Sequence, residues 1–148
     1  MRTLILYASK SGASREYAEL LWARLADCAI CDITKDLPDM EPYDTLILGS
    51  GIRMGKLYRP VRSFMRKNMS LLLSKNIAFY LCNAYPDSLQ KAIETNIPKP
   101  LRDQAACISS FGGKPPFTSL KNLEWVRMDK VASFVKTITN SASKPPSI

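Results

Sequence analysis

Histidine is absent from the 148-residue chain, and cysteine occurs at only four positions. One pair, Cys28 and Cys31, has C-x-x-C spacing, but no second pair accompanies it and no histidine can complete a zinc site. Histidine is also the commonest side chain for acid and base catalysis, so its absence removes the usual catalytic acid or base. We therefore expect no metal site, no dedicated catalytic residue, and reduced cysteines mostly buried in strands. A redox or metal role for the C-x-x-C pair is the alternative.

Long apolar runs are missing as well. No stretch of about 18 apolar residues occurs, and the N-terminus enters a strand pattern directly instead of a secretory segment. The chain length is that of one domain, and a hydrophobic content of 46% suffices for a sizeable core. We expect a soluble cytoplasmic protein with a single domain over residues 1–140 and a flexible tail over residues 141–148.

Acidic residues are few relative to basic ones: 13 against 21, for a formal net charge of +8. Such a balance favours anionic partners, namely nucleic acid, an anionic membrane surface, or an acidic small molecule or protein. A local group at Arg59, Arg62, Arg66 and Lys67 is typical of a solvated helix face, and no basic tract with interleaved aromatic residues occurs. We therefore rank nucleic-acid binding low and expect no transmembrane segment, while peripheral membrane contact stays open.

The first 25 residues indicate a buried strand, a hydroxyl-rich turn and an amphipathic helix. Leu4–Tyr7 is apolar without alternation, as in a strand covered on both faces, and Tyr17, Leu21 and Leu25 recur at helical spacing. The turn between them, Ser9–Ser14, is called the hydroxyl loop below. It places hydroxyl and N–H groups at the positive end of a helix, where phosphate binds. Ordinary connector chemistry is the alternative, because serine caps helices and glycine relaxes turns.

Four further apolar stretches predict strands, separated by helical patterns or short polar connections. This alternation is typical of an α/β domain with a parallel sheet, for which we predict the doubly wound order 2-1-3-4-5. In that order the first and third strands are neighbours, and their carboxyl ends form a ligand crevice. The strands are expected at Cys28–Ile33, Thr45–Ser50, Ile77–Cys82 and Ala105–Phe111, and helices from Arg59 through Leu73, around Leu89–Ile93 and from about Asp129.

A glycine-containing loop, Ser50–Tyr58, is predicted after the third strand. Its glycines permit positive φ angles and close approach of the backbone to a flat ligand, and Ile52 and Met54 offer apolar surface. Arg53 and Lys56 place charge at the mouth of the crevice. A purely structural turn is the alternative.

The loop after the fourth predicted strand, Asn83–Asp87, borders the same crevice. Its aromatic residue, Tyr85, can stack on an aromatic ligand, and it can equally cap the core. Both interpretations stay open at this point.

Ser9, Ser11, Gly12 and Ser14 fill every specified position of [ST]-x-[ST]-G-x-[ST], which resembles the phosphate loop of the flavodoxin superfamily. Gly49–Lys56 is similar to the Gly-x-x-Ile-Arg-x-Gly signature of bacterial flavodoxin-type, quinone-dependent protoporphyrinogen oxidases. The resemblance implies a flavodoxin-like three-layer sandwich with a five-stranded parallel sheet and noncovalently bound FMN. It implies phosphate binding by Ser9, Lys10, Ser11, Gly12, Ala13 and Ser14, and a border to the isoalloxazine ring from Ser50, Gly51, Ile52, Arg53, Met54, Gly55, Lys56, Asn83, Ala84, Tyr85 and Pro86.

Three functions follow as hypotheses. The first is an FMN-dependent oxidoreductase or electron-transfer protein, in which the flavin performs the redox chemistry and no catalytic side chain is required. The second is a quinone-dependent protoporphyrinogen oxidase of heme biosynthesis, with Arg53, Lys56 and Lys114 meeting the propionates of an acidic tetrapyrrole. The third is a cofactor-free binding or regulatory domain on the same fold. The implied partners are a redox partner protein, a quinone or an acidic small-molecule substrate.

Overall fold

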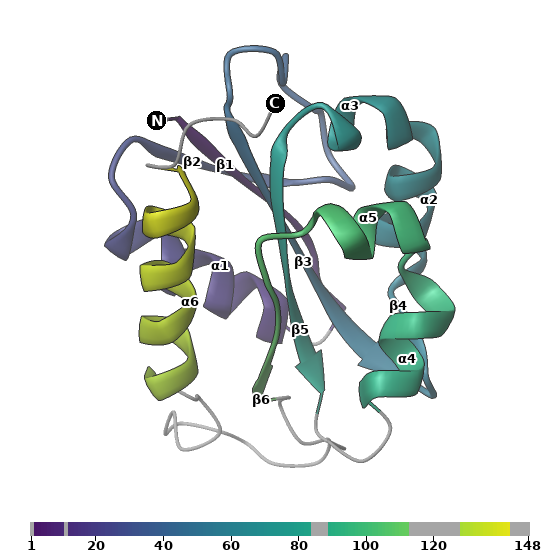
Figure 1. The fold of residues 1–148 in the computed structure, drawn as a ribbon. Coiled ribbons are helices and arrows are strands. Elements are labelled where there is room, and N and C mark those ends of the chain that lie inside the picture. Colours follow the sequence, from purple (N-terminus) through teal and green to yellow (C-terminus); the bar gives the residue numbers. More distant parts are fainter. Residues whose placement is uncertain (1, 11, 84–88, 113–127, 143–148) are drawn as a thin grey trace.

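Five parallel strands form the central sheet in the order β2-β1-β3-β5-β6, and the short strand β4 pairs antiparallel with β3 (Figure 1). The computed structural model describes residues 2–10, 12–83, 89–112 and 128–142. The long strands confirm the predicted doubly wound order. Their bounds are Thr3–Ala8 for β1, Cys28–Asp32 for β2, Thr45–Arg53 for β3, Asn76–Asn83 for β5 and Ile108–Gly112 for β6, with β4 at Lys56–Leu57.

The central strands are mainly apolar because helices cover both faces of the sheet. Every residue of β1 is buried, and β1 pairs with β3 so that Leu6 lies opposite Leu48 and Ala8 opposite Ser50. The residues of β2, at the edge of the sheet, are only half-buried. The unalternating sequence of β1 was therefore a sound indicator of a central strand.

Two helical layers sandwich the sheet (Figure 1). The helices α1 and α6 pack on one face, and α2, α3, α4 and α5 pack on the other. Their bounds are Ala13–Arg24 for α1, Arg59–Lys67 for α2, Met69–Leu73 for α3, Leu89–Asn96 for α4, Lys99–Gln104 for α5 and Met128–Ala142 for α6. The architecture is thus the three-layer sandwich that the sequence predicted.

Two helix predictions need correction. The single helix expected from Arg59 through Leu73 is divided at Asn68, whose φ of −121° interrupts the helix and whose side-chain amide donates to the Phe64 carbonyl oxygen. The last helix runs through Ala142, past residue 140, where the sequence analysis ended the domain. In both places local packing sets a boundary that apolar spacing alone does not define.

The core on the α1 and α6 face is built around aromatic side chains. Tyr17, Tyr80, Phe111 and Phe134 are at most 1% exposed. The rings of Tyr80 and Phe111 stack with centroids 5.4 Å apart, and Phe134 meets both edge-on. Since burying one large apolar side chain stabilises a fold by about 1.5–3 kcal/mol, this cluster anchors α1 firmly to the sheet.

Candidate functional site

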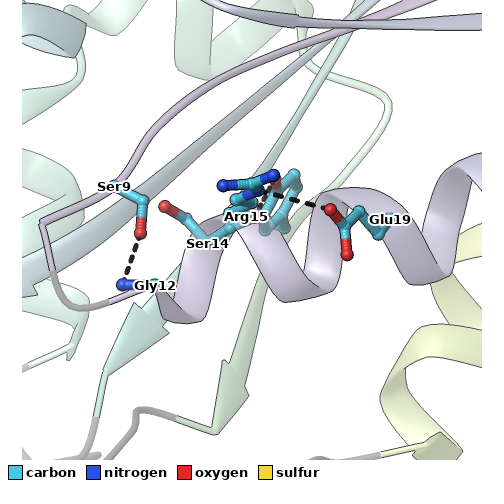
Figure 2. Close-up of polar contacts among 6 residues, drawn as sticks. Ser9, Gly12, Ser14, Arg15 and Glu19 are labelled. Atoms are coloured by element: carbon cyan, nitrogen blue, oxygen red, sulfur yellow. Dashed lines mark hydrogen bonds and ion pairs between the residues drawn. The ribbon is translucent and has the colours of Figure 1, made fainter.

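The hydroxyl loop leaves the carboxyl end of β1 and enters α1 through a tight turn (Figure 2). Gly12 occupies the left-handed region with φ of +93°, which side-chain-bearing residues rarely adopt. Its N–H donates to the Ser9 hydroxyl oxygen at 2.8 Å. The Ser14 hydroxyl donates to the Ala8 carbonyl oxygen at 2.7 Å, and Ser14 is only 1% exposed. Two serine hydroxyls therefore hold the loop in a defined shape.

This shape presents backbone donors at the start of α1. The N–H of Glu16 donates to the Gly12 carbonyl oxygen, as the first backbone bond of the helix. The N–H groups of Ala13, Ser14 and Arg15 precede it and have no acceptor inside an α-helix. Together with the positive end of the helix dipole they suit an anion. Because the Ser14 hydroxyl proton is engaged with Ala8, this residue offers its N–H rather than its hydroxyl.

The hydroxyl loop is also held from beneath by a side chain that the sequence analysis missed. The Tyr80 hydroxyl of β5 donates to the Ser14 carbonyl oxygen at 2.8 Å, across the width of β3. Burial raises the pKa of Tyr80 well above its ordinary value, so the phenol stays a neutral donor. The one signal in the sequence was Gly49, because a glycine inside a strand marks a close approach.

Gly49 makes room for the Tyr80 ring. A Cβ atom built on Gly49 would lie 1.9 Å from Cζ of Tyr80, far inside any permitted contact. The two residues are directly paired between β3 and β5. Gly51, two residues further along β3 and on the same face, has open space where its Cβ would be. Gly49 is therefore required by packing beneath the hydroxyl loop, and Gly51 is not.

The segment Ser50–Tyr58 was predicted as a loop after the third strand, and the structure corrects that prediction. The strand β3 continues to Arg53, and a tight turn at Met54 and Gly55, with φ of 54° and 77°, leads directly into β4. Two positive φ angles in sequence are those of a type I′ turn, which matches the twist of a hairpin. The usual Asn-Gly signal is absent, because methionine stands where asparagine is common. We call residues 52–57 the β3–β4 hairpin.

The tip of this hairpin is strained. A non-glycine residue in the left-handed region costs about 1–2 kcal/mol, and Met54 is such a residue. Arg53 and Lys56 lie directly opposite each other across the two strands, although like charges in that position are destabilising. Met54 is 94% exposed, so its side chain contributes little packing to the fold.

An amide from α4 holds the hairpin in place. The Asn96 side chain donates to the Gly55 carbonyl oxygen at 2.8 Å and accepts from the Leu57 N–H at 3.3 Å. The base of the hairpin is closed by the Tyr58 N–H, which donates to the Ser50 hydroxyl at 3.0 Å. Ser50 itself is 1% exposed, so it supports the hairpin from inside rather than facing a ligand.

The predicted site residues that the structure describes gather at one edge of the sheet. The pairing of Ala8 with Ser50, and of Gly51 with Cys82, brings the carboxyl ends of β1, β3 and β5 side by side. Asn83 ends β5 at this edge, and Lys10 is exposed on the hydroxyl loop. The predicted site residues Ser11, Ala84, Tyr85 and Pro86, and the candidate Lys114, lie outside the described residues.

The cysteines are free thiols. Cys82 is buried, whereas Cys28, Cys31 and Cys107 are only half-buried, so the expectation that most would be buried is wrong. Burial raises the pKa of Cys28 and of Cys107 to about 11, and it raises the pKa of Cys31 as well. These thiols are therefore protonated and weakly nucleophilic at neutral pH. Cys28 and Cys31 are three apart on one strand and point to opposite faces of the sheet, which gives the C-x-x-C redox alternative no support.

A hollow of about 410 Å³ lies against α1 and is lined by side chains of α1, β1 and β2. It is lined by Tyr7, Arg15, Glu19, Trp22, Ala23 and Ile30. Arg15 and Glu19 form an exposed ion pair at 3.3 Å (Figure 2). Burial raises the pKa of Tyr7, and the nearby Asp32 carboxylate raises it further. No residue that the sequence analysis assigned to a site lines this hollow.

Comparison with known families agrees with the fold. A family model described as a flavodoxin domain matches residues 4–143, almost the whole chain. The chain belongs to the flavodoxin domain family. The match begins in β1, includes the hydroxyl loop and the β3–β4 hairpin, and reaches the end of α6.

One curated relative of this flavodoxin-family chain is protoporphyrinogen IX dehydrogenase (quinone) of Escherichia coli strain K12. The two are 33% identical over 88 residues, which amount to 56% of this chain and 49% of the relative. The aligned part thus spans about half the length of the relative. The same figures hold for the protein of that name from the O157:H7 strain.

Solved structures share the fold at lower identity. A flavoprotein from Lactobacillus acidophilus in complex with FMN has a TM-score of 0.60 and 17% identity, covering 74% of this chain and 92% of that chain. Oxidised Flavodoxin 1 from Bacillus cereus has a TM-score of 0.60 and 22% identity, covering 95% of this chain and 98% of that chain. These similarities establish the flavodoxin-like fold.

Proposed function

We propose that this protein binds FMN noncovalently and acts as a flavodoxin-like oxidoreductase or electron-transfer protein. The observation that carries the proposal is the arrangement of the hydroxyl loop, in a chain of the flavodoxin domain family. Its backbone N–H groups and the Ser9 hydroxyl surround the positive end of α1, next to the strand ends where a flat ring can lie. This donor set fits a phosphate dianion, which it can hold without a lysine.

The chain's own residues bind and shield the cofactor in this proposal. The N–H groups of Ala13, Ser14 and Arg15 and the hydroxyl of Ser9 hold the phosphate, with Ser11 and Lys10 beside them. The ring lies between the β3–β4 hairpin and the loop after β5, where Asn83 and the predicted residues Ala84, Tyr85 and Pro86 border it. When bound, the flavin supplies the one- and two-electron redox chemistry, and the protein positions it and excludes water.

The ring-side assignments differ in what each residue can offer. Ile52 is half-buried at the base of the hairpin and can pack on a ring, whereas Met54 stands exposed at the tip. Ser50 turns inward toward Tyr58, so it supports the ring side through the backbone. Arg53 and Lys56 stay exposed at the mouth, where charged substrates or partners approach.

The first experiment measures the cofactor directly. Purified protein should be yellow and should release FMN on heating, and protein stripped of flavin should regain colour with added FMN. A colourless protein that FMN cannot reconstitute would eliminate the flavin proposal and leave the cofactor-free binding or regulatory domain.

A substitution tests where the phosphate lies. Ser11→Asp places a carboxylate in the proposed phosphate site and should abolish FMN retention through charge repulsion. The matched control is Ser70→Asp in the exposed part of α3, which adds the same charge away from the crevice. Equal FMN content in both variants and the wild type would refute the phosphate assignment.

A second candidate is the dehydrogenation of protoporphyrinogen IX with a quinone acceptor. Its first ground is the curated relative that is named for this activity and is 33% identical to this chain over 88 residues. Its second ground is a pair of exposed cations, Arg53 and Lys56, which suit the propionates of a tetrapyrrole. The test is porphyrinogen oxidation by flavin-loaded protein with menaquinone. Rapid porphyrin formation that needs both protein and quinone supports this activity, and oxidation no faster than in a protein-free control rules it out.

A further inference from the structure

Positive charge in this chain is segregated by sequence and by position in the fold. From Thr45 through Pro86 there is no aspartate or glutamate, while residues 1–44 hold more acidic than basic side chains. The basic residues of the acid-free segment are Arg53, Lys56, Arg59, Arg62, Arg66, Lys67 and Lys75. These seven side chains account for most of the net charge of +8.

Most of these cations are carried by the β3–β4 hairpin and by α2, which are consecutive in the chain. We call the exposed cations of these elements the basic face. Arg53, Lys56, Arg59, Arg66 and Lys67 are all exposed, and α2 begins two residues after β4 (Figure 1). Among the described residues, none of these five side chains forms an ion pair with a carboxylate. The positive charge of the basic face is therefore uncompensated in this part of the structure.

Two other members of the acid-free segment are already engaged. The Arg62 guanidinium donates to the Leu57 carbonyl oxygen at 3.1 Å, and Lys75 meets Glu41 at 4.0 Å. The acidic residue of the neighbouring helix α4, Glu94, accepts a hydrogen bond from Gln90. Within the acid-free segment, the exposed cations without a carboxylate partner among the described residues are thus those of the hairpin and α2.

The hairpin tip combines three features that are unfavourable for an isolated fold. Met54 has a left-handed backbone and is 94% exposed, and Arg53 and Lys56 are paired as like charges. Backbone strain in a native structure is often retained where a site needs it. An anionic surface that also accepts an apolar side chain would remove both the charge repulsion and the exposure of Met54.

We propose that the basic face docks the protein on the surface of an anionic lipid bilayer, with Met54 inserted among the headgroups. Cations clustered on one face attract anionic headgroups, and each lysine or arginine near the surface raises the affinity for the membrane roughly fivefold. A bilayer accepts a single protruding apolar side chain, whereas a protein interface needs a broad, well-packed apolar centre. In the hairpin and α2, Met54 is the one large hydrophobic side chain that is exposed, which favours lipid over a protein partner.

This docking would be peripheral. Within the described residues, no helix is both long and apolar enough to cross a bilayer. Binding carried mainly by five exposed cations is reversible and falls as salt rises, because counterions screen the attraction. The proposal concerns the protein surface alone and needs no bound flavin.

The test is co-sedimentation with vesicles of phosphatidylcholine alone or of phosphatidylcholine mixed with phosphatidylglycerol. The wild type should bind the mixed vesicles, bind phosphatidylcholine weakly, and dissociate as salt is added. The triple variant Arg53→Glu, Lys56→Glu, Arg59→Glu should bind the mixed vesicles roughly 100-fold more weakly. Met54→Ser should weaken binding by a few fold without changing its salt dependence.

The matched control makes the same change in net charge elsewhere. It is the triple variant Arg24→Glu, Lys35→Glu, Lys136→Glu, whose residues are exposed on α1, after β2 and on α6. This control should bind the mixed vesicles within about threefold of the wild type. Circular dichroism and thermal melting establish that each variant is folded.

Three outcomes would overturn the proposal. The first is an equal loss of vesicle affinity in both triple variants, and the second is equal binding of the wild type to the two vesicle types. The third is no vesicle binding by the folded wild type, which would favour an acidic protein as the partner of the basic face. Because binding is measured equally well with flavin-loaded and flavin-free protein, its failure is distinct from a failure of the flavin proposal.

Discussion

The hydroxyl loop and the β3–β4 hairpin lie at the carboxyl ends of the neighbouring strands β1 and β3 but are built in opposite ways. The hydroxyl loop is held by buried contacts from β1 and β5, with Ser14 only 1% exposed. The hairpin projects from the sheet with a 94% exposed tip and is held by the Asn96 side chain and by Ser50 at its base. The difference separates a firmly held end, where we propose that the cofactor phosphate binds, from an exposed end, where we propose that partners approach. We call these the rigid end and the exposed end.

The largest predicted effect concerns the packing under the rigid end. Gly49→Ala should destabilise the protein by about 3 kcal/mol, because its Cβ would overlap the buried Tyr80 ring. The control, Gly51→Ala, lies on the same strand and face in open space and should change stability by less than about 0.5 kcal/mol. Urea unfolding measures both. Similar stabilities for the two variants would show that the ring does not need Gly49.

Removing the Tyr80 hydroxyl should weaken the hydroxyl loop while leaving the hairpin intact. Tyr80→Phe leaves the ring stack in place but loses the bond to the Ser14 carbonyl oxygen, at a cost of about 1–2 kcal/mol. If the bond positions the phosphate donors, the affinity for FMN should fall by about fivefold while that for riboflavin stays constant. Flavin fluorescence titration measures both. Parallel losses for FMN and riboflavin would assign Tyr80 a structural role only.

A smaller effect is expected at the exposed end. Asn96→Ala removes both hydrogen bonds to the hairpin and should destabilise it by about 1 kcal/mol. Hydrogen exchange of the Leu57 amide should quicken, whereas exchange in α1 should not change. The control is Gln90→Ala, which loses an exposed contact on the same helix. Unchanged protection of Leu57 would mean that Asn96 does not hold the hairpin.

The sequence predicted the rigid end well because its signals are local. The unalternating run Leu4–Tyr7, the serines and Gly12 of the hydroxyl loop, and the apolar spacing in α1 each reflect short-range geometry. The strand order followed from the alternation of strands and helices. Tyr80 was missed because its contact with Ser14 joins residues 66 positions apart.

The exposed end was predicted less accurately for the same reason. The Met54-Gly55 turn lacks the Asn-Gly signal of a hairpin, and Asn96, which supports it, lies 41 residues beyond Gly55. Ser14 and Ser50 were both assigned to the cofactor site, yet the hydroxyl of each is engaged inside the fold. Residue type shows that a group can bind a ligand, and only the structure shows whether it is already engaged.

The central claim is that the hydroxyl loop binds the phosphate of FMN. Its most direct test is the ratio of the dissociation constants of flavin-free protein for riboflavin and for FMN, which differ only in the phosphate. Several charge-assisted hydrogen bonds to that group predict that FMN binds tighter by about 100-fold or more. Equal affinities for the two flavins, or no affinity for either, would contradict the account.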